Sequence, residues 1–269
     1  PALIRAALKA GKHVLAEKPL ATTPKEEESL LKDIECSDRL VTVNLFNRNA
    51  PYLHMAREFI ASGEIGELAL IRIDHVTPGR RFTDPIQRLD EDRRDYAVEG
   101  HVLTFCGMHY VDVARWFAGS EVKEYSVRAA RFFDSHYENH FVVHGTFENG
   151  IVFELNNSFS YSAFADQRFS QCGQQYIGSS GVVRLTHDFK TVTLQMHGRN
   201  KTVDRTMPYG GKKLDVYYDE FARALDTGDA SRLPRAIDSV VARRLSLEMT
   251  ERAVQGQVAS FGKRGEFEE

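Results

Sequence analysis

The amino-acid sequence predicts an α/β segment followed by an α+β region with a large, mostly antiparallel open sheet. Short apolar runs alternate with amphipathic helical patterns over residues 1–48, as they do in parallel-sheet proteins. Strand-like runs then dominate from residue 68, and Asn149-Gly150 separates two of them as a hairpin turn would. We therefore predict two domains, residues 1–48 and residues 49–269.

Local signals define the elements of the first segment. Helix-like sequence covers residues 2–10, and strand-like runs cover residues 13–16 and 40–45. Between the two strands, Thr23 supplies an N-cap, Pro24 the favoured first helical position and Glu26 the reciprocal capping-box partner. This combination predicts a helix that starts at residue 24.

Asn49 and Pro51 open a further helix, which leads into the strand-rich region. Strands are predicted over residues 68–76, 122–133, 141–147, 151–161, 174–177, 182–185 and 191–196. Because Asn and Gly both tolerate positive φ, Asn149-Gly150 predicts a type I′ turn. Helices are predicted from near residue 107 and over residues 214–225 and 237–254.

Composition excludes several classes of function. The formal net charge of -3, with both signs interspersed, gives no basic stripe for a phosphate backbone, so we expect no nucleic-acid partner. The cysteines Cys36, Cys106 and Cys172 form no Cys-x-x-Cys pair, and the histidines have no metal spacing, so no metal site is expected. No apolar run approaches a membrane span and no signal-peptide pattern is present, which predicts a cytoplasmic protein.

The segment GKHVLAEKPLA, residues 11–21, places Glu17, Lys18 and Pro19 directly after a predicted buried strand. Open α/β sheets bind ligands at the carboxyl ends of their strands. The alternative interpretation is a lysine that points to water. The whole segment resembles the signature of the glucose-fructose oxidoreductase, inositol dehydrogenase and MocA family.

Two longer segments carry the same resemblance. NRNAPYLHMAREFIASGEIGEL, residues 47–68, resembles the linker helix of that family, and CGMHYVDVARWFAG, residues 106–119, is similar to its catalytic helix. In the second segment His109 and Asp112 lie three residues apart, so they share one helix face, where the carboxylate could orient the imidazole. Histidine is suited to accept a hydroxyl proton near neutral pH.

The resemblance implies the C-terminal part of a Rossmann domain followed by a substrate-binding domain, with NAD or NADP as cofactor. It implies that Lys18 is the catalytic cation and His109 the base, oriented by Asp112. The implied cofactor-binding residues are Glu17, Lys18, Pro19, Asn47 and Arg48. The implied substrate-binding residues are Lys18, Arg94, Tyr96, Phe105 and His109, for a sugar, sugar derivative or cyclic polyol.

The sequence departs from the family pattern in two places. Many relatives carry an aspartate where this chain has Phe105. The chain also contains no Gly-x-Gly, the turn that holds the cofactor pyrophosphate, and it starts at Pro1 within helix-like sequence. We therefore expect a chain that lacks the first part of the nucleotide domain and binds NAD(H) weakly or not at all. The alternative is a non-catalytic sugar-binding or scaffolding relative.

Two further expectations concern surfaces. The charged stretch over residues 78–99, which contains Arg94 and Tyr96, is either a solvated loop or a lid over a polar substrate. The strand over residues 151–161 carries Phe153 and Leu155 on one face, which predicts a homo-oligomer formed through the C-terminal sheet.

Overall fold

The computed structural model describes residues 1–78, 101–132, 137–163 and 165–262. Its described residues form two compact units. The first contains Pro1–His54 and Gly211–Leu245, and the second is drawn from Met55–Gly210 and Ser246–Glu269. Helices α3 (Pro51–Ala61) and α7 (Ala236–Gln255) each contribute residues to both units.

The first unit is built on two short parallel strands. Its elements are α1 (Ala2–Lys9), β1 (Val14–Ala16), α2 (Pro24–Glu35), β2 (Val41–Val43), the 3₁₀ helix η1 (Phe46–Asn49) and α6 (Leu214–Thr227). Strands β1 and β2 pair in parallel from Val14↔Val41 to Ala16↔Val43. The predicted cap of α2 is confirmed, because the Thr23 hydroxyl accepts a hydrogen bond from the Glu26 amide at 3.3 Å.

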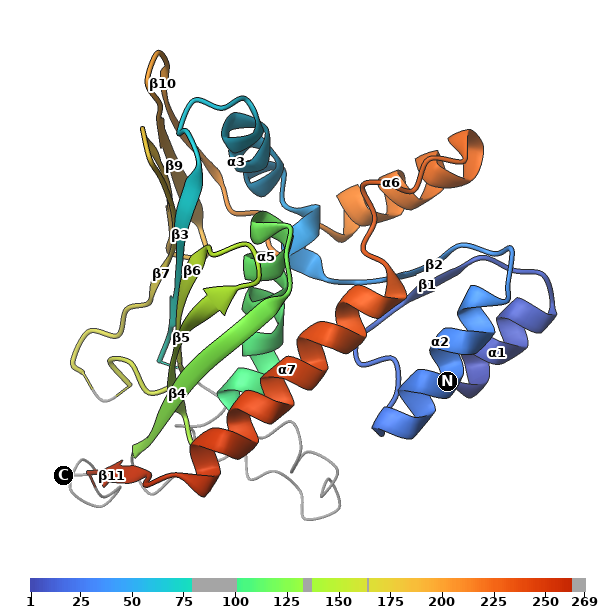
Figure 1. Cartoon of the computed structure of the whole chain (residues 1–269), viewed down its shortest axis with the longest axis horizontal. Helices are drawn as coiled ribbons and strands as arrows, with labels where there is room; N and C mark the ends of the chain where they lie inside the picture. Colours follow the sequence, from blue (N-terminus) through green and yellow to red (C-terminus); the bar gives the residue numbers. More distant parts are fainter. Residues whose placement is uncertain (79–100, 133–136, 164, 263–269) are drawn as a thin grey trace. The chain divides into compact units, whose positions relative to one another are not determined.

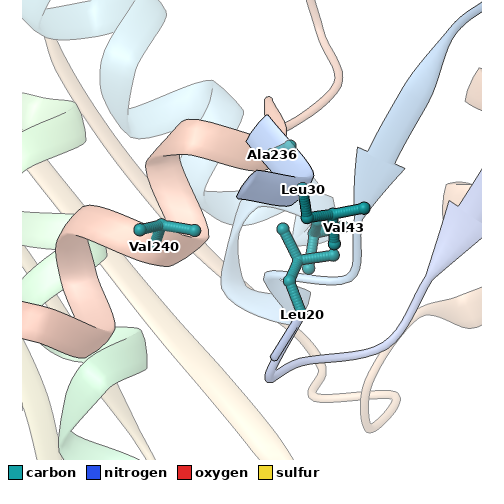
Figure 2. Packing of buried hydrophobic residues seen from close by; sticks show 5 residues of the cluster. All are labelled: Leu20, Leu30, Val43, Ala236 and Val240. Atoms are coloured by element: carbon teal, nitrogen blue, oxygen red, sulfur yellow. The ribbon is translucent and has the colours of Figure 1, made fainter. Parts of the chain in front are cut away.

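Residues far apart in the sequence make the core of the first unit. Figure 2 shows Leu20, Leu30 and Val43 with Ala236 and Val240, which come from the first part of α7. The hydroxyl of Tyr217 in α6 lies 3.0 Å from that of Thr42 in β2. Helices α6 and α7 thus complete a unit that begins at the N-terminus. The predicted domain boundary after residue 48 remains a prediction, and the described units differ from it by including Gly211–Leu245 in the first.

A buried carboxylate ties α2 to α7. Glu27 is almost fully buried, and its two carboxylate oxygens accept hydrogen bonds from Arg243 Nη1 at 2.8 Å and Arg244 Nε at 3.0 Å. A charged group taken out of water is tolerated only when its partners are in place. This ion cluster therefore fixes the first part of α7 beside α2 within the first unit.

The second unit is a nine-stranded mixed sheet with the order β10-β9-β8-β7-β3-β6-β5-β4-β11 (Figure 1). The strands are β3 (Leu68–Val76), β4 (Val122–Phe132), β5 (His140–Phe147), β6 (Val152–Ser158), β7 (Gln171–Gly178), β8 (Val182–His187), β9 (Thr191–His197), β10 (Thr202–Pro208) and β11 (Ala259–Phe261). Within the described part of this sheet, only β3–β6 and β4–β11 pair in parallel. The predicted mostly antiparallel sheet is confirmed.

One face of the sheet is covered by α5 (Met108–Ala118), which packs against β3 and β6 (Figure 1). Residue pairs such as Ile71↔Phe153 and Ile73↔Leu155 are buried on this face. The argument for an oligomer from an uncovered Phe153 and Leu155 is therefore wrong, because this chain buries both side chains itself.

Two features of the sheet differ from expectation. The β5–β6 hairpin forms, but only Gly150 has positive φ, and its amide donates to the carbonyl of Phe147 at 2.9 Å. That pattern is a type I turn followed by a left-handed glycine, not a type I′ turn. Strands β10 and β11 were not predicted, since β10 is a mostly exposed edge strand with little apolar alternation and β11 has three residues.

Within the described part of the chain, no helix has the length and apolar character needed to cross a lipid bilayer.

The ion cluster at Glu27 makes a stability prediction. Glu27→Ala leaves Arg243 buried without its carboxylate, so the free energy of unfolding of the first unit should fall by about 3–5 kcal/mol. The neighbouring Glu28→Ala removes an exposed partner of Arg244 and should cost less than about 1 kcal/mol. Urea unfolding followed by circular dichroism measures both, and equal effects would show that the cluster does not stabilise the unit.

Candidate functional site

The Glu-Lys-Pro segment lies at the carboxyl end of the two-stranded parallel sheet. Glu17, Lys18 and Pro19 follow β1 directly, and the Lys18-Pro19 peptide bond is cis. Asn44, the residue after β2, continues the ladder, because its amide donates to the carbonyl of Ala16 at 2.8 Å. The sequence prediction that these residues follow a strand end is confirmed.

Two buried asparagines hold the exposed carboxylate of Glu17. Asn44 Nδ2 donates to Glu17 Oε1 at 2.7 Å, and Asn49 Nδ2 donates to Asn44 Oδ1 at 3.1 Å. Because the oxygen of Asn44 accepts from Asn49, its amide nitrogen must face Glu17. The sequence analysis did not single out Asn44 or Asn49. Their pairing depends on β1 and β2 lying side by side.

Asn47 and Arg48 lie in η1, where Asn47 is buried and Arg48 contacts α7. Arg48 Nη1 lies 3.3 Å from Asp238 Oδ2, and Arg235 also bonds this carboxylate. Burial opposes ionisation of Asp238, but the hydrogen bond from Arg235 and the charge of Arg48 hold the pKa of this carboxyl below its usual value. The contact fixes η1 against α7. The predicted contribution of Asn47 and Arg48 to cofactor binding stays a prediction.

In the second unit, a π-helical turn, η3 (Leu103–Gly107), runs into α5. His109 and Asp112 lie one turn apart near the start of α5, and both are buried. Further along α5, Arg115 makes two hydrogen bonds to the carboxylate of Glu121, which fasten the end of the helix to the loop before β4. The predicted orientation of His109 by Asp112 stays a prediction.

Gly107 allows this turn to lie against the sheet. A Cβ atom there would lie 2.7 Å from Leu103 Cδ1 and 3.0 Å from Asn157 Oδ1. Asn157 is buried on β6, and its amide nitrogen lies 3.3 Å from the carbonyl oxygen and 3.4 Å from Nδ1 of His75 on β3. The start of the predicted catalytic helix therefore packs directly over the ends of β3 and β6.

Phe105 lies in η3, with its ring centroid 6.5 Å from that of Phe159. It thus belongs to the aromatic packing at this end of the sheet. Its predicted approach to Lys18 and the predicted distance of about 8 Å or less between Lys18 and His109 join residues of different units and stay predictions. Arg94 and Tyr96 lie outside the described residues.

A set of rings that the sequence analysis did not identify surrounds His75. We call it the histidine–aromatic cluster, and it consists of His75, Tyr110, Phe159, His187, Phe189 and Tyr209. The ring centroids of His75 and Tyr110 are 4.6 Å apart, and those of His187 and Tyr209 are also 4.6 Å apart.

Burial governs the ionisation of the cluster. It lowers the pKa of His75 to about 3 and that of His187 to about 4, and it raises the pKa of Tyr209 to about 12. At neutral pH the cluster is therefore uncharged. One signal in the sequence could have indicated the cluster. His75 follows Ile71 and Ile73 at every second position of the strand, so it is expected on the same buried face.

Among the side chains that the structure describes, no three His, Cys, Asp or Glu residues gather in a way that could bind a metal ion.

Two family descriptions match the chain. The "Oxidoreductase family, NAD-binding Rossmann fold" matches residues 1–45, and the "GFO/IDH/MocA C-terminal domain" matches residues 53–176. Inositol 2-dehydrogenase 2 of Saccharopolyspora erythraea is 34% identical over 122 residues, covering 44% of this chain and 31% of that protein. Inositol 2-dehydrogenase of Corynebacterium glutamicum is 29% identical over 192 residues, covering 66% of this chain and 51% of that protein.

Solved structures share the fold. An inositol dehydrogenase homologue complexed with NAD+ from Azotobacter vinelandii has a TM-score of 0.73 at 20% identity, covering 96% of this chain and 74% of that chain. An oxidoreductase from Agrobacterium radiobacter in complex with NAD+, L-tartaric acid and magnesium also has a TM-score of 0.73, at 17% identity, covering 95% and 75%. With both family descriptions matched in order along the sequence, the chain belongs to the GFO/IDH/MocA oxidoreductase family.

Proposed function

We propose that the chain acts as an NAD(P)-dependent dehydrogenase on a secondary alcohol of a sugar, sugar derivative or cyclic polyol. The observation that carries the proposal is the Glu17-Lys18-Pro19 segment at a strand carboxyl end, with Glu17 held by Asn44. Similarity to proteins named inositol 2-dehydrogenase favours a polyol substrate.

The residues at this edge fit one end of a dinucleotide. Glu17 offers an exposed, fixed carboxylate that could accept hydrogen bonds from ribose hydroxyl groups, and Lys18, Pro19, Asn47 and Arg48 complete the proposed set. When bound, the nicotinamide would accept a hydride from the alcohol carbon. The sequence contains no Gly-x-Gly for the pyrophosphate, so the proposal includes weak binding of NAD(H) by these 269 residues.

The proposal assigns the proton chemistry to His109 and Lys18. His109 would accept the hydroxyl proton at an imidazole nitrogen, and the ammonium group of Lys18 would stabilise the negative charge that develops on the same oxygen. Burial of His109 at the start of α5 limits the access of water to that proton. Asp112, one turn further along α5, would orient the imidazole.

Lys18→Ala tests the assignment. Loss of a positioned cation should lower turnover by at least about a hundredfold. The matched control is Lys12→Ala. It removes an exposed lysine that precedes the amino end of β1, and it should leave turnover within about twofold of that of the starting enzyme. Oxidation of myo-inositol followed by NADH absorbance measures both variants, in a form of the protein that binds NAD(H).

Near-normal turnover by Lys18→Ala would contradict the catalytic role of this residue. Binding of myo-inositol without turnover, in a form that binds NAD(H), would favour the non-catalytic sugar-binding relative.

The second prediction concerns the cofactor. Pyrophosphate recognition uses several charge-assisted amide contacts of roughly 1.5–3 kcal/mol each, so their loss weakens binding by some orders of magnitude. Calorimetric titration of the 269-residue chain with NADH should therefore give no saturable binding at micromolar concentration. A micromolar dissociation constant would contradict this prediction. If Glu17→Gln then raised that constant, the main cofactor contacts would lie at the Glu-Lys-Pro segment rather than at a pyrophosphate turn.

The face of the sheet opposite α5, which no described helix covers, is proposed as the surface for a second copy of the chain. A shallow pocket on it is lined by Arg72, Asp74, Val142, His144, Glu154 and Asn156. Val142 and Val152 are 43% and 42% exposed there. A surface that combines exposed apolar side chains with both signs of charge can be complementary to the same surface on a second copy of the chain.

Light scattering at micromolar concentration should show a dimer or larger assembly. Val142→Glu combined with Val152→Glu should lower the mass to that of a monomer, because each carboxylate would be buried at the interface. Val254→Glu is the matched control, since Val254 is 43% exposed on α7 and should leave the mass unchanged. A monomeric starting protein would overturn the proposal.

A further inference from the structure

The second unit buries a carboxylate that the proposed chemistry does not use. Glu138 lies just before β5, at the end of the sheet where β6 finishes, and it is 2% exposed. Its Oε1 accepts a hydrogen bond from Arg131 Nη2 at 2.6 Å, and its Oε2 lies 3.0 Å from His101 Nδ1. His101 directly precedes the helical segment that runs through η3 into α5. Glu138 therefore contacts the chain at the point where this segment begins.

The backbone around Glu138 is firmly held. The side chain of the next residue, Asn139, bonds the backbone of Phe132 twice: Oδ1 accepts from the amide and Nδ2 donates to the carbonyl, both at 3.0 Å. The amide of Phe159, just after β6, donates to the carbonyl of Asn139 at 2.8 Å. These bonds attach the segment to β4 and to the end of β6. Glu138 is thus a fixed point relative to the sheet.

His101 connects this fixed point to the helical segment. Its carbonyl accepts hydrogen bonds from the amide of Phe105 and from the hydroxyl of Thr104, both at 3.0 Å. Its ring lies edge-on to the buried ring of Phe141, with 6.2 Å between centroids, and to that of Tyr137, with 5.1 Å. Because the backbone of His101 closes the first turn, a shift of this residue would carry the start of the segment with it.

The contact with Glu138 requires one protonation state of His101. Burial lowers the pKa of His101, the charge of Glu138 opposes this effect and the charge of Arg131 adds to it. The ring is therefore neutral at neutral pH and carries one proton. A carboxylate oxygen only accepts, so it favours this proton on Nδ1, although Oε2 lies off the line of a hydrogen bond.

Stability alone does not explain this arrangement. Taking a carboxylate out of water is costly, and apolar residues of similar volume often stabilise a fold as well as a buried ion pair does. Arg131 is 37% exposed, so its charge stays partly in water and the carboxylate of Glu138 is the group withdrawn from it. A fixed charge at the start of a helical segment does, however, define where that segment lies.

We propose that Glu138 is a positioning residue, which holds His101 in place and so fixes the start of the helical segment that carries His109. His109 follows His101 by about two helical turns. The role goes beyond the proposed function, and only its effect on turnover rests on that function. In this role Glu138 contacts neither substrate nor cofactor and transfers no proton.

Kinetics of two variants test the role, in a form of the protein that binds NAD(H). Glu138→Ala removes the contact, so kcat for myo-inositol should fall at least about tenfold while KM changes less than about threefold. Glu138→Gln keeps both contacts, because its amide oxygen can accept from Arg131 and its amide nitrogen can donate to His101 once the ring proton moves to Nε2. Its kcat should stay within about threefold of that of the starting enzyme. A kcat in Glu138→Gln as low as that in Glu138→Ala would overturn positioning in favour of a role of the charge itself.

Glu121→Ala is the matched control for stability. Glu121 bonds Arg115 at the other end of α5, and it is 54% exposed while Arg115 is 7% exposed. Its loss should lower the melting temperature, because Arg115 remains buried without its partner, but kcat should stay within about threefold because His109 lies at the start of α5. Equal loss of kcat in Glu121→Ala and Glu138→Ala would overturn the proposal, since stability alone would then explain both.

NMR of the 269-residue chain with ¹⁵N-labelled histidine tests the role without turnover. The ring proton of His101 should lie on Nδ1 in the starting protein and on Nε2 in Glu138→Gln. The ring signals of His109 should move in Glu138→Ala and stay in place in Glu138→Gln and Glu121→Ala. His101→Gln and His109→Gln assign the two sets of signals.

The NMR outcome stands apart from the proposed function. Movement of the His109 signals in Glu138→Ala supports positioning even if Lys18→Ala shows that the proposed catalysis is wrong. If Glu138→Ala does not fold, Glu138→Asp takes its place, because its shorter side chain draws the carboxylate away from His101. Unmoved His109 signals in the variant that folds would overturn the inference and leave the role of Lys18 to its own test.

Discussion

The close packing of η3 against β6 is the constraint on which the second unit's site depends. A Cβ atom at residue 107 would lie 2.7 Å from Leu103 Cδ1 and 3.0 Å from the amide oxygen of Asn157, so Gly107 leaves room for these two side chains beside the helix start. This approach buries His109 and brings Tyr110 over His75. The helix start itself is a π-helical turn, and such turns are frequent at functional sites. In the first unit a side-chain hydrogen bond positions the candidate residues instead: Asn44, just after β2, donates to the carboxylate of Glu17, just after β1.

Most of the elements could be predicted from the sequence because their signals are local. The capping residues Thr23 and Glu26 lie within one helical turn, and the central strands alternate apolar and polar side chains. The β10 strand lacked that alternation because an edge strand need not bury either face. The return of residues 211–245 to the first unit depends on partners nearly 200 residues apart or more, such as Arg48–Asp238 and Glu27–Arg243. No local pattern identifies those pairs.

The candidate functional residues likewise fall into those that could be identified from the sequence and those that could not. The Glu17-Lys18-Pro19 segment was identified because its residues are adjacent in the sequence and follow a strand. The asparagines that hold Glu17 were not, because their role requires β2 beside β1. The histidine–aromatic cluster draws on two strands, three loops and α5, so only strand register and helix packing bring its rings together. A motif search finds groups that lie in one segment, whereas a cluster assembled from many segments is recognised only in the three-dimensional structure.

The Glu-Lys-Pro segment of the first unit and the histidine–aromatic cluster of the second unit differ in burial, and each environment has its own chemical consequence. Glu17 and Lys18 lie at a partly exposed strand end, where water can reach their side chains. His75 and His187 are neutral, because burial makes their protonation unfavourable. A neutral imidazole can still donate a hydrogen bond through one ring nitrogen and accept one through the other. The cluster therefore keeps polar groups inside the second unit without a buried charge that would need an ionic partner.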